Sequence, residues 1–370
     1  MKEDIFYMKK AIELAKKGEG YVNPNPMVGC VIVKKDKIIG EGYHERFGGH
    51  HAEVNAIKSA TESIEGGTIY ITLEPCTHYG KTPPCILKVI KEKPKKVVIG
   101  VLDPNPLVCG KGMEMLIEEG IEVKVGILEE ECRELNEVFF HYITKKKPLC
   151  ILKGAMSLDG KIATKYGESK WISNEKSRKI TAEYRHKYSG IMVGINTVLK
   201  DNPMLTCRIE NGISPVRVIL DSKLRIPLDS NIVKDKENKT IVFTTVKDDK
   251  KIEQLNREGV QVIITPIKNS KVQLPFVIEK LYELNIDSLL IEGGGTLNDS
   301  LFKEGIVDKL KLFIAPKIIG GRDSKNFIAG DGVEFLSEAT NIFVKKITNI
   351  EGDILIEGDV IKEERVCLQE

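Results

Sequence analysis

The sequence lacks an excess of charge of either sign. Its 56 lysines and arginines nearly balance its 54 aspartates and glutamates, so the formal net charge is +2 over 370 residues. Proteins that bind long nucleic acids usually carry a concentrated basic surface, because they must neutralise many phosphates. The near balance therefore argues against a nucleic-acid partner. It leaves room for a small phosphorylated substrate, which needs only a few local cations.

Long hydrophobic runs and a disulfide framework are also missing. The N-terminal MKEDIFYMKK has no apolar segment of the kind found in signal peptides, and no later run of about 18 apolar residues would cross a membrane. The 8 cysteines are scattered rather than clustered as in small disulfide-rich domains. We therefore expect a cytoplasmic protein in a reducing compartment, with no membrane partner.

The length and the element pattern predict two α/β domains. A chain of 370 residues exceeds one ordinary domain. The basic, proline-ended segment Lys145-Lys146-Lys147-Pro148 is the best boundary, which gives domains at 1–145 and 148–362. Strands alternate with helices on both sides of this boundary, as in sheets covered by helices. In the second domain we expect strands at 149–155, 191–194, 216–220, 240–244, 260–265 and 288–291.

One constellation in the first half carries metal chemistry. His51 and Glu53 begin an expected helix, Cys76 follows the expected strand 68–73, and Cys85 opens another helix after two prolines. One imidazole and two thiolates can hold Zn²⁺ and leave a fourth position for a water molecule. A nearby carboxylate that is not a ligand can then carry protons, so we expect His51, Cys76 and Cys85 to bind zinc and Glu53 to be catalytic.

A structural zinc site is the alternative to a catalytic one. It requires a fourth protein ligand, for which His50, His78 and Cys30 are candidates. The adjacent Glu53 favours the catalytic interpretation. Upstream, the proline-rich Asn23-Pro24-Asn25-Pro26 is either a connecting loop or a rigid support for the amide of Asn23, which would then bind a polar ring of the substrate.

The strings HAE, PCTHYGKTPPC and NPNPMVG resemble the deaminase domain of the bifunctional riboflavin-biosynthesis deaminase/reductases. The eight residues between Cys76 and Cys85 exceed the two of the general zinc-deaminase pattern, and they are the usual form in this family. The resemblance implies a cytidine-deaminase-like α/β/α sandwich. It also implies zinc ligation by His51, Cys76 and Cys85, with Glu53 as proton donor. Lys81, in the loop between the cysteines, is a candidate contact for a phosphate.

The second half contains a glycine-rich turn and the single tryptophan. Gly293, Gly294 and Gly295 lie between an expected strand and an expected helix, where exposed backbone N–H groups can hold a phosphate or simply form a tight turn. Trp171 is either an anchor at the edge of the core or a wall against a flat ring. Ser173 is expected to cap the helix that follows it.

Five strings in this half, KGAMSLDGKIA, SKWIS, GINTVLKDNPMLTCR, VILDSKLRIP and IEGGGTLN, resemble the dihydrofolate-reductase-like reductase domain of the same family. The resemblance implies NADPH as the cofactor. The residues implied to bind it are Ala155, Trp171, Thr197, Asp201, Ser222, Gly294, Gly295, Thr296, Leu297 and Asn298. The residues expected to bind substrate are Lys153, Ser169, Arg185, Leu205, Arg208 and Glu292, with Asn23 in the first domain. Lys223 and Arg225 are either contacts for the 2′-phosphate of NADPH or solvated charges.

These resemblances imply two consecutive reactions in riboflavin biosynthesis. The first is the zinc-dependent deamination of 2,5-diamino-6-(5-phosphoribosylamino)pyrimidin-4-one, and the second is the NADPH-dependent reduction of the ribosyl chain of the resulting uracil to ribityl. We expect a homo-oligomer, as in the family. Two other functions remain: a nucleoside or RNA deaminase whose second domain binds nucleotide without catalysis, and a non-catalytic sensor with a structural zinc.

Overall fold

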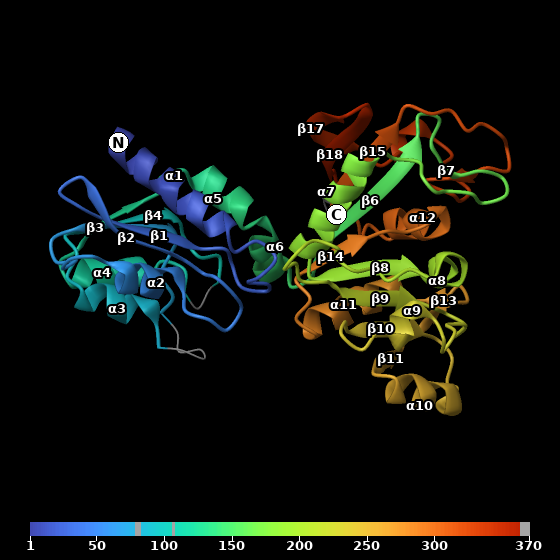
Figure 1. The fold of residues 1–370 in the computed structure, drawn as a ribbon, viewed down its shortest axis with the longest axis horizontal. Coiled ribbons are helices and arrows are strands. Elements are labelled where there is room, and N and C mark those ends of the chain that lie inside the picture. The colour runs from blue at the N-terminus through green and yellow to red at the C-terminus, as the bar shows by residue number, and fades with distance from the viewer. Residues whose placement is uncertain (78–82, 106–107, 363–370) are drawn as a thin grey trace, which may run out of the picture. The chain divides into compact units, whose positions relative to one another are not determined.

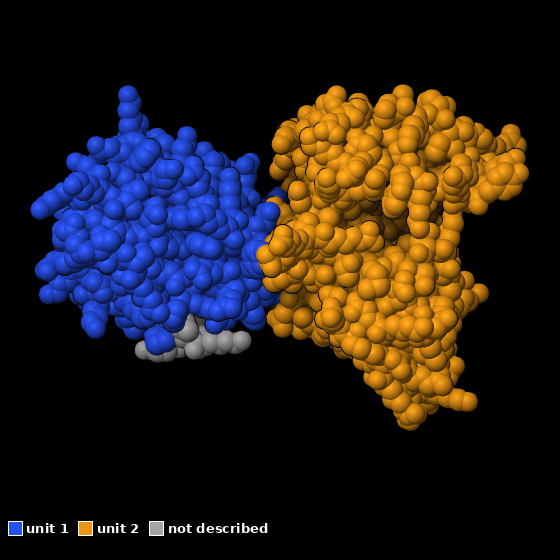
Figure 2. Space-filling model, in the orientation of Figure 1, with its two compact units in different colours: residues 1–147 blue, residues 148–370 orange. Residues whose placement is uncertain are grey.

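The chain divides into two units, residues 1–147 and 148–370, coloured separately in Figure 2. The structure, a computed structural model, describes residues 1–77, 83–105 and 108–362. His78 and Lys81, considered above as a zinc ligand and a phosphate contact, lie outside the described residues. Within the described part, no helix is long and apolar enough to span a membrane.

The first unit is built on one mixed five-stranded sheet. Its strands follow the order β2 (Lys37–Tyr43), β1 (Gly29–Lys34), β3 (Thr68–Leu73), β4 (Lys96–Val101) and β5 (Glu122–Val125). β1 pairs antiparallel with β2 and with β3, whereas β3, β4 and β5 run parallel. Successive residues of the central strands point to opposite faces, so these strands bury apolar side chains on both sides.

Helices cover both faces of this sheet. They are α1 (Lys2–Lys16), α2 (Ala52–Ser59), α3 (Cys85–Lys91), α4 (Lys111–Glu118), α5 (Glu129–Leu135) and α6 (Glu137–Lys145). On one face α1 and α5 pack on Val31, Val33 and Val98, and on the other α2, α3 and α4 pack on the alternate residues Ile32 and Ile99 (Figure 1). The first unit is therefore an α/β/α sandwich.

The second unit contains a nine-stranded sheet. Its order is β11 (Val260–Ile264), β10 (Thr240–Thr244), β9 (Val216–Leu220), β8 (Gly190–Gly194), β14 (Ser288–Ile291), β6 (Leu149–Ser157), β15 (Lys309–Ala315), β18 (Asp353–Val360) and β17 (Ile342–Ile350). From β11 to β15 the strands are parallel, and β18 and β17 extend the sheet antiparallel. The parallel strands therefore end at one common edge, where α/β proteins bind ligands.

The helices of this unit are α7 (Glu175–Lys187), α8 (Ile195–Asp201), α9 (Asn231–Lys234), α10 (Asp249–Arg257), α11 (Leu274–Glu283) and α12 (Gly295–Lys303), with the 3₁₀ turn η1 (Leu336–Glu338). Two small ribbons pair β7 (Lys161–Ala163) with β16 (Lys325–Asn326) and β12 (Ile267–Lys268) with β13 (Lys271–Val272). The prediction that Ser173 caps α7 is wrong. The cap is Asn174, whose side chain accepts a hydrogen bond from the Ser177 amide at 2.9 Å.

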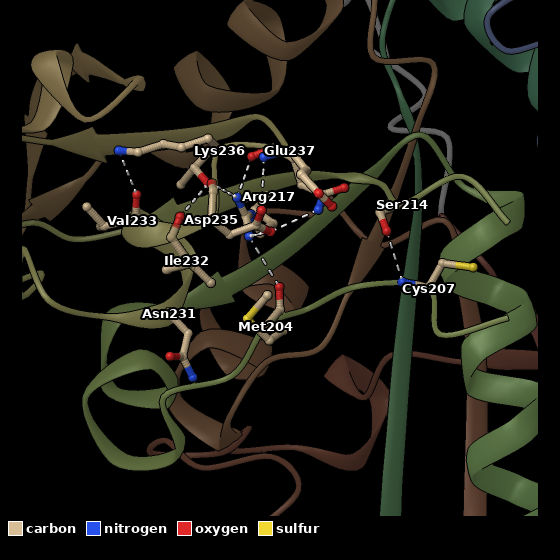
Figure 3. A network of polar contacts seen from close by, with 12 residues as sticks. Met204, Cys207, Ser214, Arg217, Asn231, Ile232, Val233, Asp235, Lys236 and Glu237 are labelled. Carbon is tan, nitrogen blue, oxygen red and sulfur yellow. Dashed lines mark hydrogen bonds and ion pairs between the residues drawn. The ribbon is translucent and has the colours of Figure 1, made fainter. Parts of the chain in front are cut away.

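A buried ion pair supports the loops at one side of the sheet (Figure 3). Arg217 of β9 is fully buried, and its Nη1 lies 2.8 Å from a carboxylate oxygen of Asp235. The same guanidinium donates to the backbone carbonyls of Asp235, Asn238 and Met204. Met204 precedes Leu205 and Arg208, two of the expected substrate-binding residues. The Arg217 cluster therefore links the segment that carries them to the sheet.

Candidate active sites

The three expected zinc ligands lie together in the first unit. His51 is the residue before α2, Cys76 follows β3, and Cys85 is the first residue of α3. The donor atoms lie within 4.8 Å of one another, with His51 Nδ1 at 3.6 Å from Cys76 Sγ and 3.2 Å from Cys85 Sγ. Ligands around a tetrahedral Zn²⁺ are about 3.5 Å apart, given bond lengths of about 2.0 and 2.3 Å. The donor set therefore fits zinc.

The two cysteines also support each other. The backbone N–H of Cys85 lies 3.3 Å from Cys76 Sγ. The hydrogen bond from the Cys85 thiol lowers the pKa of Cys76 to about 4, while the same contact raises the pKa of Cys85. This contact therefore favours the thiolate form of Cys76, which is the form that a metal requires.

Two of the other candidate ligands, Cys30 and His50, do not join this group. Cys30 lies fully buried in the sheet core, and His50 is exposed. Among the described residues the cluster contains three donors, His51, Cys76 and Cys85. Three protein ligands leave a position for water, which is the pattern of catalytic rather than structural zinc sites.

Glu53 lies on the first turn of α2, beside the donor cluster. Its side chain is buried, with 3% exposed, and it lines the same cavity as His51 and Cys76. Burial raises the pKa of Glu53 to about 7, and the nearby Cys76 thiolate adds to the increase. A carboxyl group that is easily protonated beside three metal donors is suited to carrying protons.

The cavity beside this cluster has a volume of about 400 Å³. Asn25 and His44 line it, and the Asn25 amide nitrogen lies 3.2 Å from His44 Nε2. The other ring nitrogen of His44 lies 3.0 Å from the carbonyl of His50, and burial lowers the pKa of this histidine. Asn23, the expected substrate contact, is not among the described lining residues. The sequence reasoning missed Asn25 and His44.

A second buried carboxylate holds one wall of this cavity. Glu74 Oε2 accepts hydrogen bonds from the amides of Asp103 (3.2 Å) and Gly110 (3.0 Å). Its Oε1 accepts from the amides of Gly112 (2.9 Å) and Met113 (3.3 Å). Since Asp103 also lines the cavity, Glu74 fixes the loop that closes the site.

The second unit contains a cavity of about 1350 Å³ at the carboxyl ends of its parallel strands, and this unit is hollowed on the face seen in Figure 2. Most of the residues expected to bind cofactor or substrate line it: Lys153, Ala155, Ser169, Trp171, Arg185, Thr197, Asp201, Arg208, Ser222, Glu292, Gly294, Gly295, Thr296 and Leu297. Leu205 and Asn298 are buried and are not among the described lining residues. Their expected contacts with ligands remain predictions.

One end of this cavity carries a charged cluster. Glu292 forms a bidentate ion pair with Arg185, with N–O distances of 2.9 and 2.8 Å. Burial raises the pKa of Glu292, but the charges of Arg185 and Lys153 outweigh this effect and hold it at about 2. Burial lowers the pKa of Lys153, and Glu292 partly offsets that effect. Arg208 lines the same cavity. The cluster therefore presents more positive than negative charge to an anion.

The glycine-rich turn lies in the same cavity, between β14 and α12. A side chain on Gly294 would meet nothing within 4 Å, so this backbone is open to a ligand. Gly295 has no such space, because an added Cβ would lie 2.5 Å from the carbonyl oxygen of Asn326. Asn298 donates to the Phe327 carbonyl at 2.8 Å and holds the turn from behind. The turn therefore fits the close approach of a phosphate group.

Trp171 is held at the rim of the cavity with 60% of its surface exposed. The Arg178 guanidinium lies 4.5 Å from the centre of its ring, and Lys317 Nζ donates to the Trp171 carbonyl at 2.8 Å. An aromatic ring fixed in this way and left open on one side can stack against a flat ligand.

Comparison with known proteins accounts for both units. Residues 1–101 match the cytidine and deoxycytidylate deaminase zinc-binding region, and residues 148–356 match the RibD C-terminal domain. The chain is 49% identical to the riboflavin biosynthesis protein RibD of Actinobacillus pleuropneumoniae, across 97% of this chain and 96% of that protein. It is 47% identical to the RibD protein of Aquifex aeolicus, across 95% and 97% of the two chains.

Solved structures agree over the whole length. RibD of Acinetobacter baumannii aligns with a TM-score of 0.89 at 36% identity and covers 98% of this chain and 99% of its own. The deaminase/reductase of Thermotoga maritima aligns with a TM-score of 0.86 at 41% identity, covering 97% and 99%. The chain therefore belongs to the RibD family of bifunctional riboflavin-biosynthesis deaminase/reductases.

Proposed function

We propose that the chain carries out two consecutive steps of riboflavin biosynthesis, one in each unit. The first unit deaminates 2,5-diamino-6-(5-phosphoribosylamino)pyrimidin-4-one, and the second reduces the ribosyl chain of 5-amino-6-(5-phosphoribosylamino)uracil to ribityl with NADPH. The observation that carries this proposal is the presence of two separate sites on one chain. One is a three-donor metal cluster with an adjacent buried glutamate, and the other is a large cavity with a glycine-rich turn.

In the first unit His51, Cys76 and Cys85 would hold zinc, which supplies a water molecule acidified for attack at neutral pH. Glu53 takes up a proton at its carboxylate and returns protons to the ring nitrogen and the departing amine. Asn25 and His44, which line the same cavity, orient the ring through hydrogen bonds. The cavity of about 400 Å³ suits a ligand of one ring and its substituents.

In the second unit the glycine-rich turn and Trp171 would hold NADPH, which supplies the hydride. Arg208 and Arg185 attract the substrate phosphate, and Glu292 fixes Arg185 in one orientation through their paired hydrogen bonds. Lys153 Nζ holds a proton close to Glu292, beside the space for the sugar. We assign proton donation to Lys153 for this reason.

The deaminase assignment is tested with Glu53→Gln. The variant is expected to bind zinc at the wild-type level and to lose ammonia release by at least about 100-fold, the range for loss of a positioned acid–base group. NADPH oxidation on the deaminated uracil substrate should be unchanged. Glu65→Gln, at an exposed position in the same unit, is the matched control. Ammonia release at the wild-type rate by Glu53→Gln would refute the role of Glu53.

The reductase assignment is tested by following NADPH absorbance after addition of the deaminated substrate. Wild-type protein should oxidise NADPH, and Arg208→Ala should raise KM for this substrate more than it lowers kcat, because the arginine attracts a phosphate that does not react. The nucleoside or RNA deaminase with a non-catalytic second domain predicts no NADPH consumption. That result would refute the second activity and leave the first standing.

A further inference from the structure

The segment between β7 and α7 forms a strap at the rim of the large cavity. This strap, residues 164–173, consists of turns and irregular backbone, and it carries Ser169 and Trp171, which both line the cavity. Its own backbone hydrogen bonds close a tight turn: the Thr164 amide donates to the Glu168 carbonyl, and the Gly167 amide donates to the Thr164 carbonyl. The position of the strap over the cavity therefore depends on contacts with side chains from other elements.

Two lysines hold the strap by its carbonyl groups. Lys200 of α8 donates to the Gly167 carbonyl. Lys317, which follows β15, donates to the carbonyls of Trp171 at 2.8 Å and Ile172 at 2.7 Å. Hydrogen bonds from charged donors are stronger than those between neutral groups, so these two side chains fix the backbone of the strap at two points.

Arg178 of α7 makes a third contact with the strap and also reaches the Trp171 ring. Its Nη1 donates to the Ser173 carbonyl at 2.7 Å, and its guanidinium carbon lies 4.5 Å from the centre of the indole. The face of an aromatic ring is negative, so it attracts a guanidinium group placed over it. The indole has 60% of its surface exposed, and Arg178 gives it a fixed support in this open position.

Helix α7 connects this contact to the charged cluster. Four residues of the helix line the cavity at helical spacing: Arg178, Thr181, Ala182 and Arg185. Residues seven apart lie on the same face of a helix, so Arg178 and Arg185 are two turns, or about 10 Å, apart along the axis. Arg185 pairs with Glu292, while Arg178 supports Trp171. The same helix therefore sets both the charged end of the site and its aromatic wall.

The place of Trp171 along the sheet indicates which ring of a ligand it meets. Lys317, which binds the Trp171 carbonyl, follows β15, and β15 pairs with β6. β6 carries Lys153, the proton donor in the function proposed above. Hydride and proton must reach the same sugar, so the nicotinamide is the flat ring on this side of the cavity.

We propose that Arg178 is a positioning residue for the reductase reaction: it holds the Trp171 indole in the orientation in which the ring stacks on the nicotinamide of NADPH. This inference rests on the reductase function proposed above. Lys200 and Lys317 keep the strap in place, and Arg178 sets the direction of the ring. Because Arg178 acts through the indole, its contribution to NADPH binding depends on the presence of Trp171.

The test measures NADPH binding to the full-length protein by calorimetry. Arg178→Gln removes the charge over the ring and should weaken binding by about 5- to 30-fold, the range for loss of a cation–π contact. Arg178→Lys keeps the charge without the planar group and should give an intermediate affinity. Lys176→Gln is the matched control, because it makes the same charge change at an exposed position of α7 that does not line the cavity. Should Arg178→Gln fail to fold, Arg178→Lys carries the same measurements.

Fluorescence reports on the ring directly, because Trp171 is the only tryptophan of the chain. In wild-type protein and in Lys176→Gln, the anisotropy decay should show an indole that rotates with the protein. In Arg178→Gln the decay should gain a fast local component, because the ring has lost its support. Wild-type NADPH affinity or a wild-type anisotropy decay in Arg178→Gln would overturn the proposal.

A double-variant cycle separates support of the ring from direct contact with the ligand. Trp171→Ala should weaken NADPH binding. Adding Arg178→Gln to it should change the affinity by less than about twofold, because the guanidinium no longer has a ring to orient. If the two losses instead multiply in the double variant, Arg178 contacts the ligand independently and the proposal is wrong.

Failure of the reductase function itself gives a different result. Wild-type protein that neither binds nor oxidises NADPH refutes that function and this inference together. If wild-type protein oxidises NADPH and Arg178→Gln binds it as well as Lys176→Gln does, the reductase function stands and the role of Arg178 alone is refuted.

Discussion

Glu74→Gln changes one oxygen of a buried carboxylate to an amide nitrogen and keeps the side-chain shape. Each oxygen of Glu74 accepts two backbone N–H groups, those of Asp103 and Gly110 on one side and those of Gly112 and Met113 on the other. A carboxylate can accept at both oxygens, whereas an amide NH₂ only donates. Whichever way the glutamine is turned, two backbone donors therefore face a third donor inside the protein.

The magnitude follows from the cost of leaving buried donors without acceptors. Each such group costs about 1–3 kcal/mol, so two of them should destabilise the first unit by about 2–6 kcal/mol. The affected loop carries Asp103 and Asn105 into the deaminase cavity. The rate of ammonia release should therefore fall together with the stability of the first unit. NADPH oxidation on the deaminated substrate should be unchanged, because the second unit takes no part in this contact.

The assay combines urea unfolding of the first unit with hydrogen exchange of the four amides that Glu74 binds. Faster exchange at these amides should accompany the lower free energy of unfolding. Glu114→Gln, on the exposed face of α4, makes the same charge change and should alter stability by no more than about 0.5 kcal/mol. If Glu74→Gln matched this control in both measurements, the carboxylate would not be what holds the loop.

Three further predictions concern the other buried charges and the metal. Arg217→Met should destabilise the second unit by about 3–5 kcal/mol in urea unfolding, because it leaves the Asp235 carboxylate unpaired, whereas Lys239→Met at an exposed site should not. The lowered pKa of Glu292 stabilises the fold above its ordinary pKa of 4.5, and this contribution is lost as the pH falls toward about 2. The difference in unfolding free energy between wild type and Glu292→Gln should therefore shrink across that interval, and a constant difference would contradict the ion-pair explanation. Removing zinc with a chelator should abolish ammonia release and lower the melting temperature of the first unit alone, as calorimetry would show.

The zinc cluster was the part of the site most open to prediction, because its chemistry restricts the residues strongly. An imidazole, two thiols and a carboxylate at the ends of expected strands and helices have few common purposes. The ring contacts were harder to predict. Asn23 and Asn25 are each followed by a proline, and only the path of the loop turns Asn25 toward the cavity. His44 follows the last residue of β2 and belongs to no motif, so its burial and its contact with Asn25 were the first signals of its position.

The strands of the second unit also differ in how well the sequence predicts them. The expected strands at 216–220, 240–244, 260–265 and 288–291 correspond to β9, β10, β11 and β14. Of these, β9, β10 and β14 are mostly buried, and strands buried on both faces have continuous apolar runs. The strands β15, β17 and β18 were not predicted. β17 lies at the sheet edge, and most of its residues are exposed, so IFVKKITNI has no clear alternation. Its place depends on pairing with β18, which local sequence does not reveal.

Local charge, rather than net charge, makes the second unit suitable for small anions. Lys153, Arg185 and Arg208 lie with the carboxylate of Glu292 at one end of the cavity, and the exposed Lys223, Arg225 and Lys271 line it toward β9. The glycine-rich turn lies between them and adds backbone donors. One cavity thus offers cationic side chains and backbone donors, both of which attract phosphate groups. A chain with a net charge of +2 can therefore attract small phosphorylated molecules locally, while its overall charge gives it no general attraction to long polyanions.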